Sequence, residues 1–137
     1  MPLPSLVNGS LPPGTFIATP AEVVAAFDQP GAVTRPALNR ALEHAVTLIW
    51  SGDSAAIIYL DGSYATDKGD PVDVDLAVRS DVWTDSLFLS TFASNYPGEE
   101  TLVDFYFNTQ RSAQRMEELF REIQGQTAKK GIVQLIP

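Results

Sequence analysis

The sequence contains no cysteine and a single histidine, His44, among its 137 residues. Without cysteine the chain cannot form disulfides, thiolate metal sites or a cysteine nucleophile. A zinc site built from several histidines is excluded as well. His44 lies off the apolar stripe of its expected helix, which favours an ordinary surface or boundary position over a catalytic role.

Basic residues are also few. Lys and Arg total 9 against 17 Asp and Glu, so the formal net charge is −8 at pH 7. Lys129-Lys130 is the only basic pair. Affinity for a long polyanion comes mainly from neutralised phosphates, so we expect no strong binding to a long nucleic acid. A single nucleotide remains compatible with this charge, because metal ions can carry its phosphates.

Long apolar runs are missing too. No run approaches the roughly 18 residues that span a bilayer, and residues 1–14 lack the basic and apolar segments of a signal peptide. We therefore expect no membrane partner and a cytoplasmic location. Pro, Gly and Ser are concentrated in residues 1–18 and predict an extended arm lying on the domain. The length predicts a single domain over residues 19–137.

Apolar residues make up 45% of the chain, enough for a core, and their spacing predicts the elements. The first helix starts at a capping box, in which Thr19 is the cap and Glu22 the third helical residue. Trp50, Trp83 and Phe92 are expected in the core. In chain order we expect a helix ending at Pro30-Gly31, a helix from Thr34 or Pro36 to Trp50, strands over 55–60 and 72–78, a helix over 81–95, a strand over 102–107, a helix over 112–124 and a strand over 131–136. This order predicts a compact α/β or α+β sandwich with a mixed sheet.

Most of the candidate functional residues lie in residues 60–78, LDGSYATDKGDPVDVDLAV. Asp73 and Asp75 alternate with apolar residues in the expected strand, and residues i and i+2 of a strand project to the same face. Two carboxylates held that close repel each other unless a cation lies between them, and aspartate is a poor strand former. The pair therefore predicts a Mg²⁺ site that Mn²⁺ can also occupy, since hard oxygen ligands suit these ions.

Two further features complete the predicted site. Gly62 directly follows an apolar strand and permits close backbone approach to a phosphate, and Ser63 adds an N–H and a hydroxyl. Asp104 lies among apolar and aromatic residues in LVDFYF, where a charge is costly unless it is paired, so we expect it to share the metal. An anion cradle beside a cation site is what phosphoryl or nucleotidyl transfer requires.

Five nearby side chains each have two interpretations. Lys68, in the loop, and Arg79, just past the strand, are candidates for nucleotide phosphate contacts, although a solvated surface charge is the favoured interpretation of each. Arg111 and Arg115 are weaker candidates of the same kind. Tyr64, beside the turn, could stack on a base or pack into the domain.

The motif resembles that of the DNA polymerase β-like nucleotidyltransferase superfamily. It consists of Gly62-Ser63, nine further residues, Asp73-Val74-Asp75 and then Asp104 on a later strand. The longer sequence around the motif, YLDGSYATDKGDPVDVDLAV, together with KGIVQL near the C-terminus, resembles a bacterial family of small uncharacterised nucleotidyltransferase-like proteins. That resemblance covers about residues 11–136.

The resemblance implies a nucleotidyltransferase-like mixed sheet flanked by helices, two Mg²⁺ ions and an NTP substrate. Under it, Asp73 and Asp75 bind metal and the triphosphate, while Asp104 activates the acceptor hydroxyl near the other ion. Gly62 and Ser63 hold the β- and γ-phosphates. The superfamily includes minimal members in toxin–antitoxin pairs, some of which transfer AMP or another nucleotide to a protein or RNA. A cognate toxin or antitoxin is therefore one implied partner.

Three functions are consistent with the sequence. The first is a Mg²⁺-dependent nucleotidyltransferase that modifies a protein, an RNA or a small molecule, and the presence of all three carboxylates favours it. The second is a catalytically inactive member that binds a nucleotide or a partner protein, because a shared fold does not guarantee activity. The third is a metal-free structural domain. Within the first, the acidic composition favours a protein or small-molecule acceptor over RNA.

Overall fold

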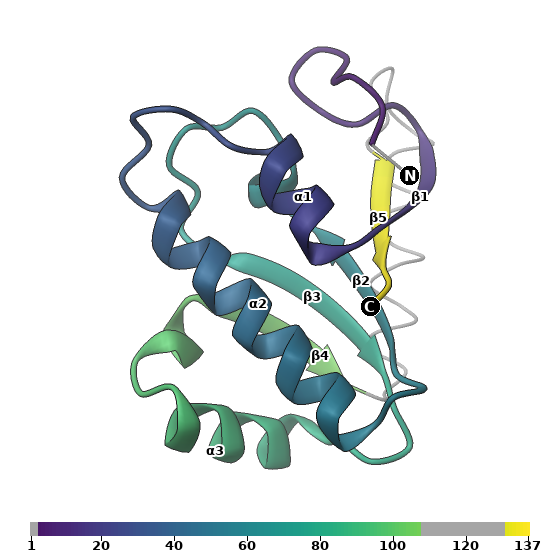
Figure 1. The fold of residues 1–137 in the computed structure, drawn as a ribbon, viewed down its shortest axis with the longest axis vertical. Coiled ribbons are helices and arrows are strands. Elements are labelled where there is room, and N and C mark those ends of the chain that lie inside the picture. The colour runs from purple at the N-terminus through teal and green to yellow at the C-terminus, as the bar shows by residue number, and fades with distance from the viewer. Residues whose placement is uncertain (1–2, 108–130) are drawn as a thin grey trace.

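The structure of the protein is a computed structural model, and it describes residues 3–107 and 131–137. These residues form a mixed five-stranded sheet with three α-helices, an α+β fold (Figure 1). The fold class expected from the sequence is therefore confirmed. The helix expected over 112–124, together with Arg111, Arg115 and Lys129-Lys130, lies outside the described residues. None of the described helices is long and apolar enough to cross a membrane.

The strands follow the order β1-β5-β2-β3-β4 across the sheet. The pairs β1–β5 and β3–β4 are parallel, whereas β2 runs antiparallel to both β5 and β3. The central β2 and β3 are joined by residues 62–73, so this loop lies at one end of the sheet. The strands are β1 (Gly14–Ala18), β2 (Ile57–Asp61), β3 (Val74–Arg79), β4 (Val103–Phe107) and β5 (Gly131–Leu135).

The N-terminal segment is more regular than the sequence predicts. Within the expected arm over residues 1–18, Gly14–Ala18 forms the edge strand β1, in register with β5. Upstream, Val7 and Ser10 exchange backbone hydrogen bonds of 2.7 and 3.2 Å in a turn, and the Asp67 N–H donates to the Gly9 carbonyl at 2.9 Å. These contacts attach the arm to the β2–β3 loop. The strand was missed because the partner that defines it comes from the far end of the chain.

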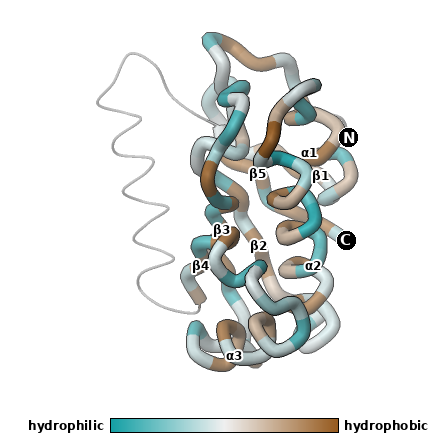
Figure 2. The backbone as a smooth tube through the Cα atoms, turned by 90° about the vertical axis from the view of Figure 1, so that its left-hand side faces the viewer, coloured by the Kyte–Doolittle hydropathy of each residue, from teal (hydrophilic) through white to brown (hydrophobic). Residues whose placement is uncertain are grey.

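The helices are α1 (Pro20–Ala26), α2 (Arg35–Gly52) and α3 (Asp85–Asn95). Helices α1 and α2 cover one face of the sheet, and α3 lies beyond its β4 edge (Figure 1). In the edge-on view, α1 and α2 lie on the same side of β2 and β3 (Figure 2). The predicted capping box is confirmed, since the Glu22 N–H donates to Thr19 Oγ1 at 3.2 Å and the Thr19 N–H donates to Glu22 Oε1 at 3.0 Å. The helix that it starts ends at Ala26, earlier than the sequence predicts.

The core lies between α2 and the sheet. The apolar stripe predicted for this helix is confirmed, because all of its members are buried: Leu38, Leu42, Ala45, Val46 and Ile49. Trp83 and Phe92 are buried as expected, while Trp50 is only partly buried and packs against the edge of the core. Burial of the Leu, Val and Ile side chains contributes about 1.5–3 kcal/mol each, so the packing of α2 stabilises the sheet.

Several element boundaries differ from the sequence-based expectation; β2, for example, covers Ile57–Asp61 instead of 55–60. Strand β3 starts at Val74, so Val72, expected at the strand's apolar face, precedes it and is 72% exposed. The helix expected over 81–95 starts at Asp85, because Thr84 caps it by accepting from the Leu87 N–H at 3.2 Å. Within this helix Phe88 and Phe92 are buried, whereas Leu87 is 46% exposed.

Candidate metal and nucleotide site

The three predicted carboxylates come together at one end of β3 and β4. One oxygen from each of Asp73, Asp75 and Asp104 lies within 4.8 Å of the others, and all three residues are partly exposed. The sheet register explains this, because Asp75 is directly paired with Asp104 in the parallel β3–β4 ladder. Asp73 lies two residues before Asp75. The structure therefore assembles the acidic group that the sequence predicts.

Electrostatic repulsion is the main physical property of this group. Two ionised carboxylates about 5 Å apart repel each other by roughly 1–3 kcal/mol, depending on how well water screens them. A divalent cation would offset that repulsion, and three carboxylate oxygens on a partly exposed surface are a donor set that suits Mg²⁺ or Mn²⁺. The residues present therefore fit the expected ion.

Gly62 lies directly against the carboxylate of Asp75. Its φ is +82°, in the region that favours glycine, and a Cβ on it would lie 1.8 Å from Asp75 Oδ2. No side chain can be accommodated there without moving the carboxylate. A glycine is therefore needed at this position because any side chain would collide with the Asp75 carboxylate. Its predicted contact with a phosphate stays a prediction.

The next residues form a tight turn beside the acids. Ser63–Ala65 is a short 3₁₀ helix, closed by a 3.1 Å hydrogen bond from the Ala65 N–H to the Gly62 carbonyl. The Thr66 hydroxyl donates to the Ser63 carbonyl at 2.6 Å. These bonds hold Ser63 in the turn that directly follows Gly62.

Arg35 is the organising residue that sequence reasoning missed. Its side chain is 1% exposed and donates to the carbonyls of Tyr64 at 3.0 Å, Thr66 at 2.8 Å and Lys68 at 2.6 and 3.2 Å. The guanidinium carbon also lies 5.2 Å from the centre of the Tyr64 ring. Burial lowers the pKa of Arg35, but five donors in a fixed fork suit this carbonyl cage. One signal was available, since Arg35 is in the first turn of α2, where the helix dipole disfavours a cation.

Asp70 holds the second half of the same loop. Its Oδ1 accepts from the Val33 N–H at 2.7 Å and from the Thr34 N–H at 3.0 Å, while the Thr34 hydroxyl donates to the Pro71 carbonyl at 2.8 Å. The backbone amides of Thr34 and Val33 lower the pKa of Asp70 by stabilising its ionised form. Together with Arg35, Asp70 fixes the loop to the start of α2.

Replacing Asp70 by asparagine should therefore change how stability depends on pH. Because the folded-state pKa is lowered, Asp70 contributes stability above its unfolded pKa of about 3.9, and that contribution is lost as the pH falls through the folded pKa. We expect Asp70→Asn to be less stable than the wild type at pH 6 and to approach it below pH 3. Urea unfolding at both pH values measures this difference, and an equal gap at both would contradict it.

Lys68 and Arg79 are both exposed, but only Lys68 belongs to the loop beside the acids. Arg79 ends β3 opposite Ile57, four residues beyond Asp75. At about 3.3 Å per residue this separates the two backbones by roughly 13 Å along the strand. The structure therefore does not bring Arg79 to the acidic group.

Tyr64 packs into the domain, and the alternative that it stacks on a base is wrong. Its side chain is fully buried, and its hydroxyl donates to Asn39 Oδ1 on α2. Its ring contacts Phe27, with 6.3 Å between the ring centres, and lies under Arg35. Burial raises the pKa of its hydroxyl, so the group stays protonated as a donor.

Asp61 is a further acid near the site that sequence reasoning did not single out. It ends β2 and pairs with Asp75 in the antiparallel ladder, just as Asp104 pairs with Asp75 on the other side. Carboxylates therefore occupy matching positions on three adjacent strands. The sequence signal was present, but the strand was expected to end at Leu60, one residue too early for Asp61 to be read as part of it.

His44 lies at the boundary of the fold, as the sequence suggests, and it has partners. Its Nδ1 is 2.8 Å from Glu99 Oε1, and its ring stacks on Tyr96 with 4.0 Å between the ring centres. These contacts join α2 to the segment between α3 and β4. They give His44 a structural explanation.

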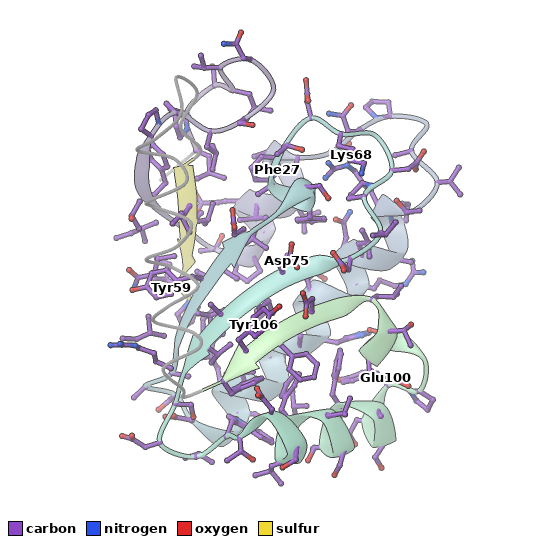
Figure 3. All side chains as sticks on the ribbon, turned by 180° about the vertical axis from the view of Figure 1, so that it is seen from behind. Phe27, Tyr59, Lys68, Asp75, Glu100 and Tyr106 are labelled. Atoms are coloured by element: carbon purple, nitrogen blue, oxygen red, sulfur yellow. The ribbon has the colours of Figure 1, made fainter. Side chains whose placement is uncertain are left out.

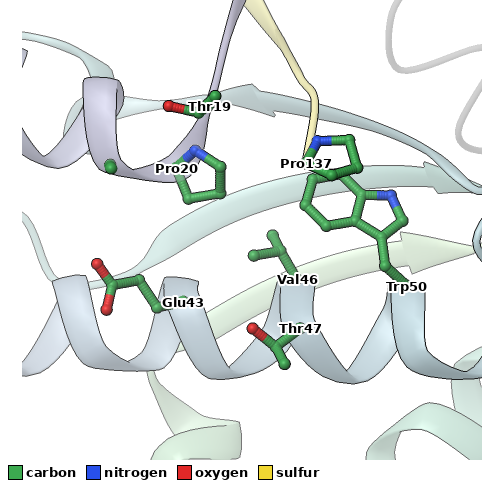
Figure 4. Close-up of a pocket in the computed structure, with 8 residues that line it drawn as sticks. Thr19, Pro20, Glu43, Val46, Thr47, Trp50 and Pro137 are labelled. Atoms are coloured by element: carbon green, nitrogen blue, oxygen red, sulfur yellow. The ribbon is translucent and has the colours of Figure 1, made fainter.

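A groove of about 440 Å³ lies away from the acids, between α1, α2 and the C-terminal residue (Figure 4). Its walls are mostly apolar, and its lining residues are Thr19, Pro20, Ala21, Glu43, Val46, Thr47, Trp50 and Pro137. Helix α2 packs on the sheet face opposite to the one shown in Figure 3, where Asp75 points toward the viewer. The groove is therefore separate from the candidate site.

Neither the curated proteins nor the solved structures gave a match. A family model described as "Family of unknown function (DUF6932)" matches residues 4–136. This match spans nearly the whole chain, and the protein therefore belongs to the DUF6932 family of unknown function.

Proposed function

We propose that this protein is a Mg²⁺-dependent nucleotidyltransferase that transfers a nucleotide from an NTP to a protein, an RNA or a small molecule. The observation that supports the proposal best is the convergence of Asp73, Asp75 and Asp104 within 4.8 Å of one another. The Gly62 turn lies against the Asp75 carboxylate, so the backbone N–H and hydroxyl of Ser63 would be available to a phosphate near the same point. Metal and phosphate could thus be bound side by side.

Each residue has a role in this proposal. Asp73 and Asp75 would hold Mg²⁺, which supplies charge neutralisation for the triphosphate. Asp104 would accept the proton of the acceptor hydroxyl as its oxygen bonds to the α-phosphorus. The bond from that phosphorus to the bridging oxygen breaks, and pyrophosphate leaves. Ser63 would donate hydrogen bonds to the β- and γ-phosphates, and Lys68 would add a positive charge in the same loop.

The resemblance to the DNA polymerase β-like superfamily adds support, because the motif and its strand context agree. It also suggests a cognate toxin or antitoxin as a partner. The net charge of −8 favours a protein or small-molecule acceptor over RNA. A partner that supplies a basic surface would be needed for RNA.

Label transfer is the direct test of this function. The protein is incubated with each α-³²P-labelled NTP, Mg²⁺ or Mn²⁺ and cell lysate, and labelled acceptors are separated on a gel. We expect transfer by the wild type and by Asp81→Asn, an exposed acid away from the site, and at least a hundredfold loss in Asp75→Asn. Transfer that survives Asp73→Asn and Asp75→Asn would contradict the assigned site. Nucleotide binding without transfer would instead indicate an inactive, nucleotide-binding member.

The proposed ion site also predicts that Asp73→Asn raises the melting temperature without ligands but removes the stabilisation that ligands give. Without ligands, Asp73→Asn should melt roughly 2–4 °C above the wild type, because it relieves repulsion within the acidic group. With Mg²⁺ and NTP, only the wild type should gain the stabilisation that binding gives, about 2.7 kcal/mol at a ligand concentration 100 times the Kd. Differential scanning fluorimetry measures both, with Asp81→Asn as the control for the change in net charge. A metal-free structural domain would show no ligand shift in either protein.

A further inference from the structure

Tyr106 lies beside the acidic group and contacts one of its members. It follows Asp104 by two residues on β4, so both side chains project from the same face of the sheet. The Tyr106 hydroxyl donates to Asp104 Oδ2 at 3.2 Å. Both residues are partly buried. Among the described residues, Tyr106 is the side-chain donor to Asp104, and no lysine or arginine of that part of the chain pairs with it.

The sheet places a second tyrosine symmetrically to the first. Tyr106 pairs with Ala77 on β3, and Ala77 pairs on its other side with Tyr59 on β2. Each tyrosine therefore lies two residues along its strand from a carboxylate, on the same face of the sheet as Asp75 (Figure 3). Tyr59 differs from Tyr106 in a useful way, since no hydrogen bond joins its hydroxyl to a carboxylate among the described residues. It is a matched control for ring, face and position in the sheet.

We propose that Tyr106 is a positioning residue, which orients the carboxylate of Asp104 toward the cation and the acceptor. The inference rests on the proposed function, because it assumes a cation at the acidic group. A hydrogen bond to one oxygen restricts rotation of a carboxylate about its Cβ–Cγ bond. The carboxylate is then held in the orientation that brings one of its oxygens within 4.8 Å of oxygens of Asp73 and Asp75. Groups that hold a metal ligand in this way typically change metal affinity by about 10- to 100-fold when they are removed.

The chemistry of the contact agrees with this role. A neutral hydroxyl contacts Asp104 without placing a positive charge beside it, so it does not compete with a cation for the carboxylate. An arginine or lysine at the same place would form an ion pair and compete with the metal. A tyrosine is thus suited to an acid that has to remain available.

Binding of Mn²⁺ to the purified full-length chain tests the inference without any nucleotide. Free Mn²⁺ is measured by electron paramagnetic resonance during titration of the wild type, Tyr106→Phe, Tyr59→Phe and Asp75→Asn. We expect Tyr106→Phe to raise the Kd about tenfold, Tyr59→Phe to change it less than twofold, and Asp75→Asn to abolish binding. In the background of Asp104→Asn, Tyr106→Phe should have no further effect. Circular dichroism melting checks that each variant is folded.

The outcomes separate this inference from the proposed function. Unchanged Mn²⁺ affinity in Tyr106→Phe, with binding lost in Asp75→Asn, would overturn the positioning role alone. No Mn²⁺ uptake by the wild type would overturn both the role and the metal site. The expected affinities without label transfer from any NTP would overturn the transferase activity and leave the positioning role standing. Where transfer is present, higher Mn²⁺ concentrations should restore it in Tyr106→Phe, which a merely structural defect would not permit.

Discussion

Replacing Arg35 by methionine is expected to lower the free energy of unfolding by about 3–5 kcal/mol. The substitution keeps much of the side-chain volume but removes the donors that serve the carbonyls of Tyr64, Thr66 and Lys68. Each buried carbonyl left without a donor costs about 1–3 kcal/mol, and water can reach only part of this cage. Domains of this size are stable by about 5–15 kcal/mol, so this loss would be a large fraction of the total stability.

Urea unfolding followed by circular dichroism measures this loss. The matched control is Arg40→Met, which makes the same chemical change on an exposed side chain of the same helix. We expect Arg40→Met to change stability by less than about 0.5 kcal/mol. Equal effects of the two substitutions would show that net charge matters and that the carbonyl cage does not.

A methyl group on Gly62 is expected to disable the site while leaving a folded protein. In Gly62→Ala the new Cβ would require the place now taken by Asp75 Oδ2, 1.8 Å away, so the carboxylate has to rotate out of the acidic group. The backbone φ of +82° adds a strain of about 1–2 kcal/mol for a residue with a side chain. Loss of one of three oxygen ligands should weaken Mn²⁺ binding by at least tenfold.

The same loop contains a control for this substitution. Gly69 has open space where a Cβ would be added, and its backbone is outside the positive-φ region. Gly69→Ala should therefore keep both stability and Mn²⁺ affinity close to the wild type. Mn²⁺ titration and urea unfolding of the two variants give the comparison. An unaltered Mn²⁺ affinity in Gly62→Ala would mean that Asp75 does not contribute to the ion site.

Local patterns in the sequence predicted the parts of the fold that local physics determines. The stripe from Leu38 to Ile49 specified α2, and the capping box at Thr19 specified the start of α1. The acidic group was predictable for a similar reason. Asp73 and Asp75 are linked by strand periodicity, and Asp104 is a single charge in an apolar strand, so each was recognisable before its partners were known.

The parts that were not predicted depend on contacts between distant segments. Strand β1 exists through its pairing with β5, and Asp61 joins the acids only because β2 pairs with β3 in a particular register. The acceptors of Arg35 are backbone carbonyls 29–33 residues further along the chain, and any sequence supplies such carbonyls. Side-chain identity therefore revealed which groups could do chemistry, but it could not reveal what holds them in place.

The proposal that Asp73, Asp75 and Asp104 bind a catalytic cation is tested most directly by anomalous scattering. A crystal of the protein grown with Mn²⁺ and a non-hydrolysable NTP analogue gives a metal position that no other atom can imitate. We predict an anomalous peak within about 2.1 Å of carboxylate oxygens of this group, with the triphosphate beside Gly62 and Ser63. An ordered nucleotide with no Mn²⁺ peak at these three residues would contradict the account.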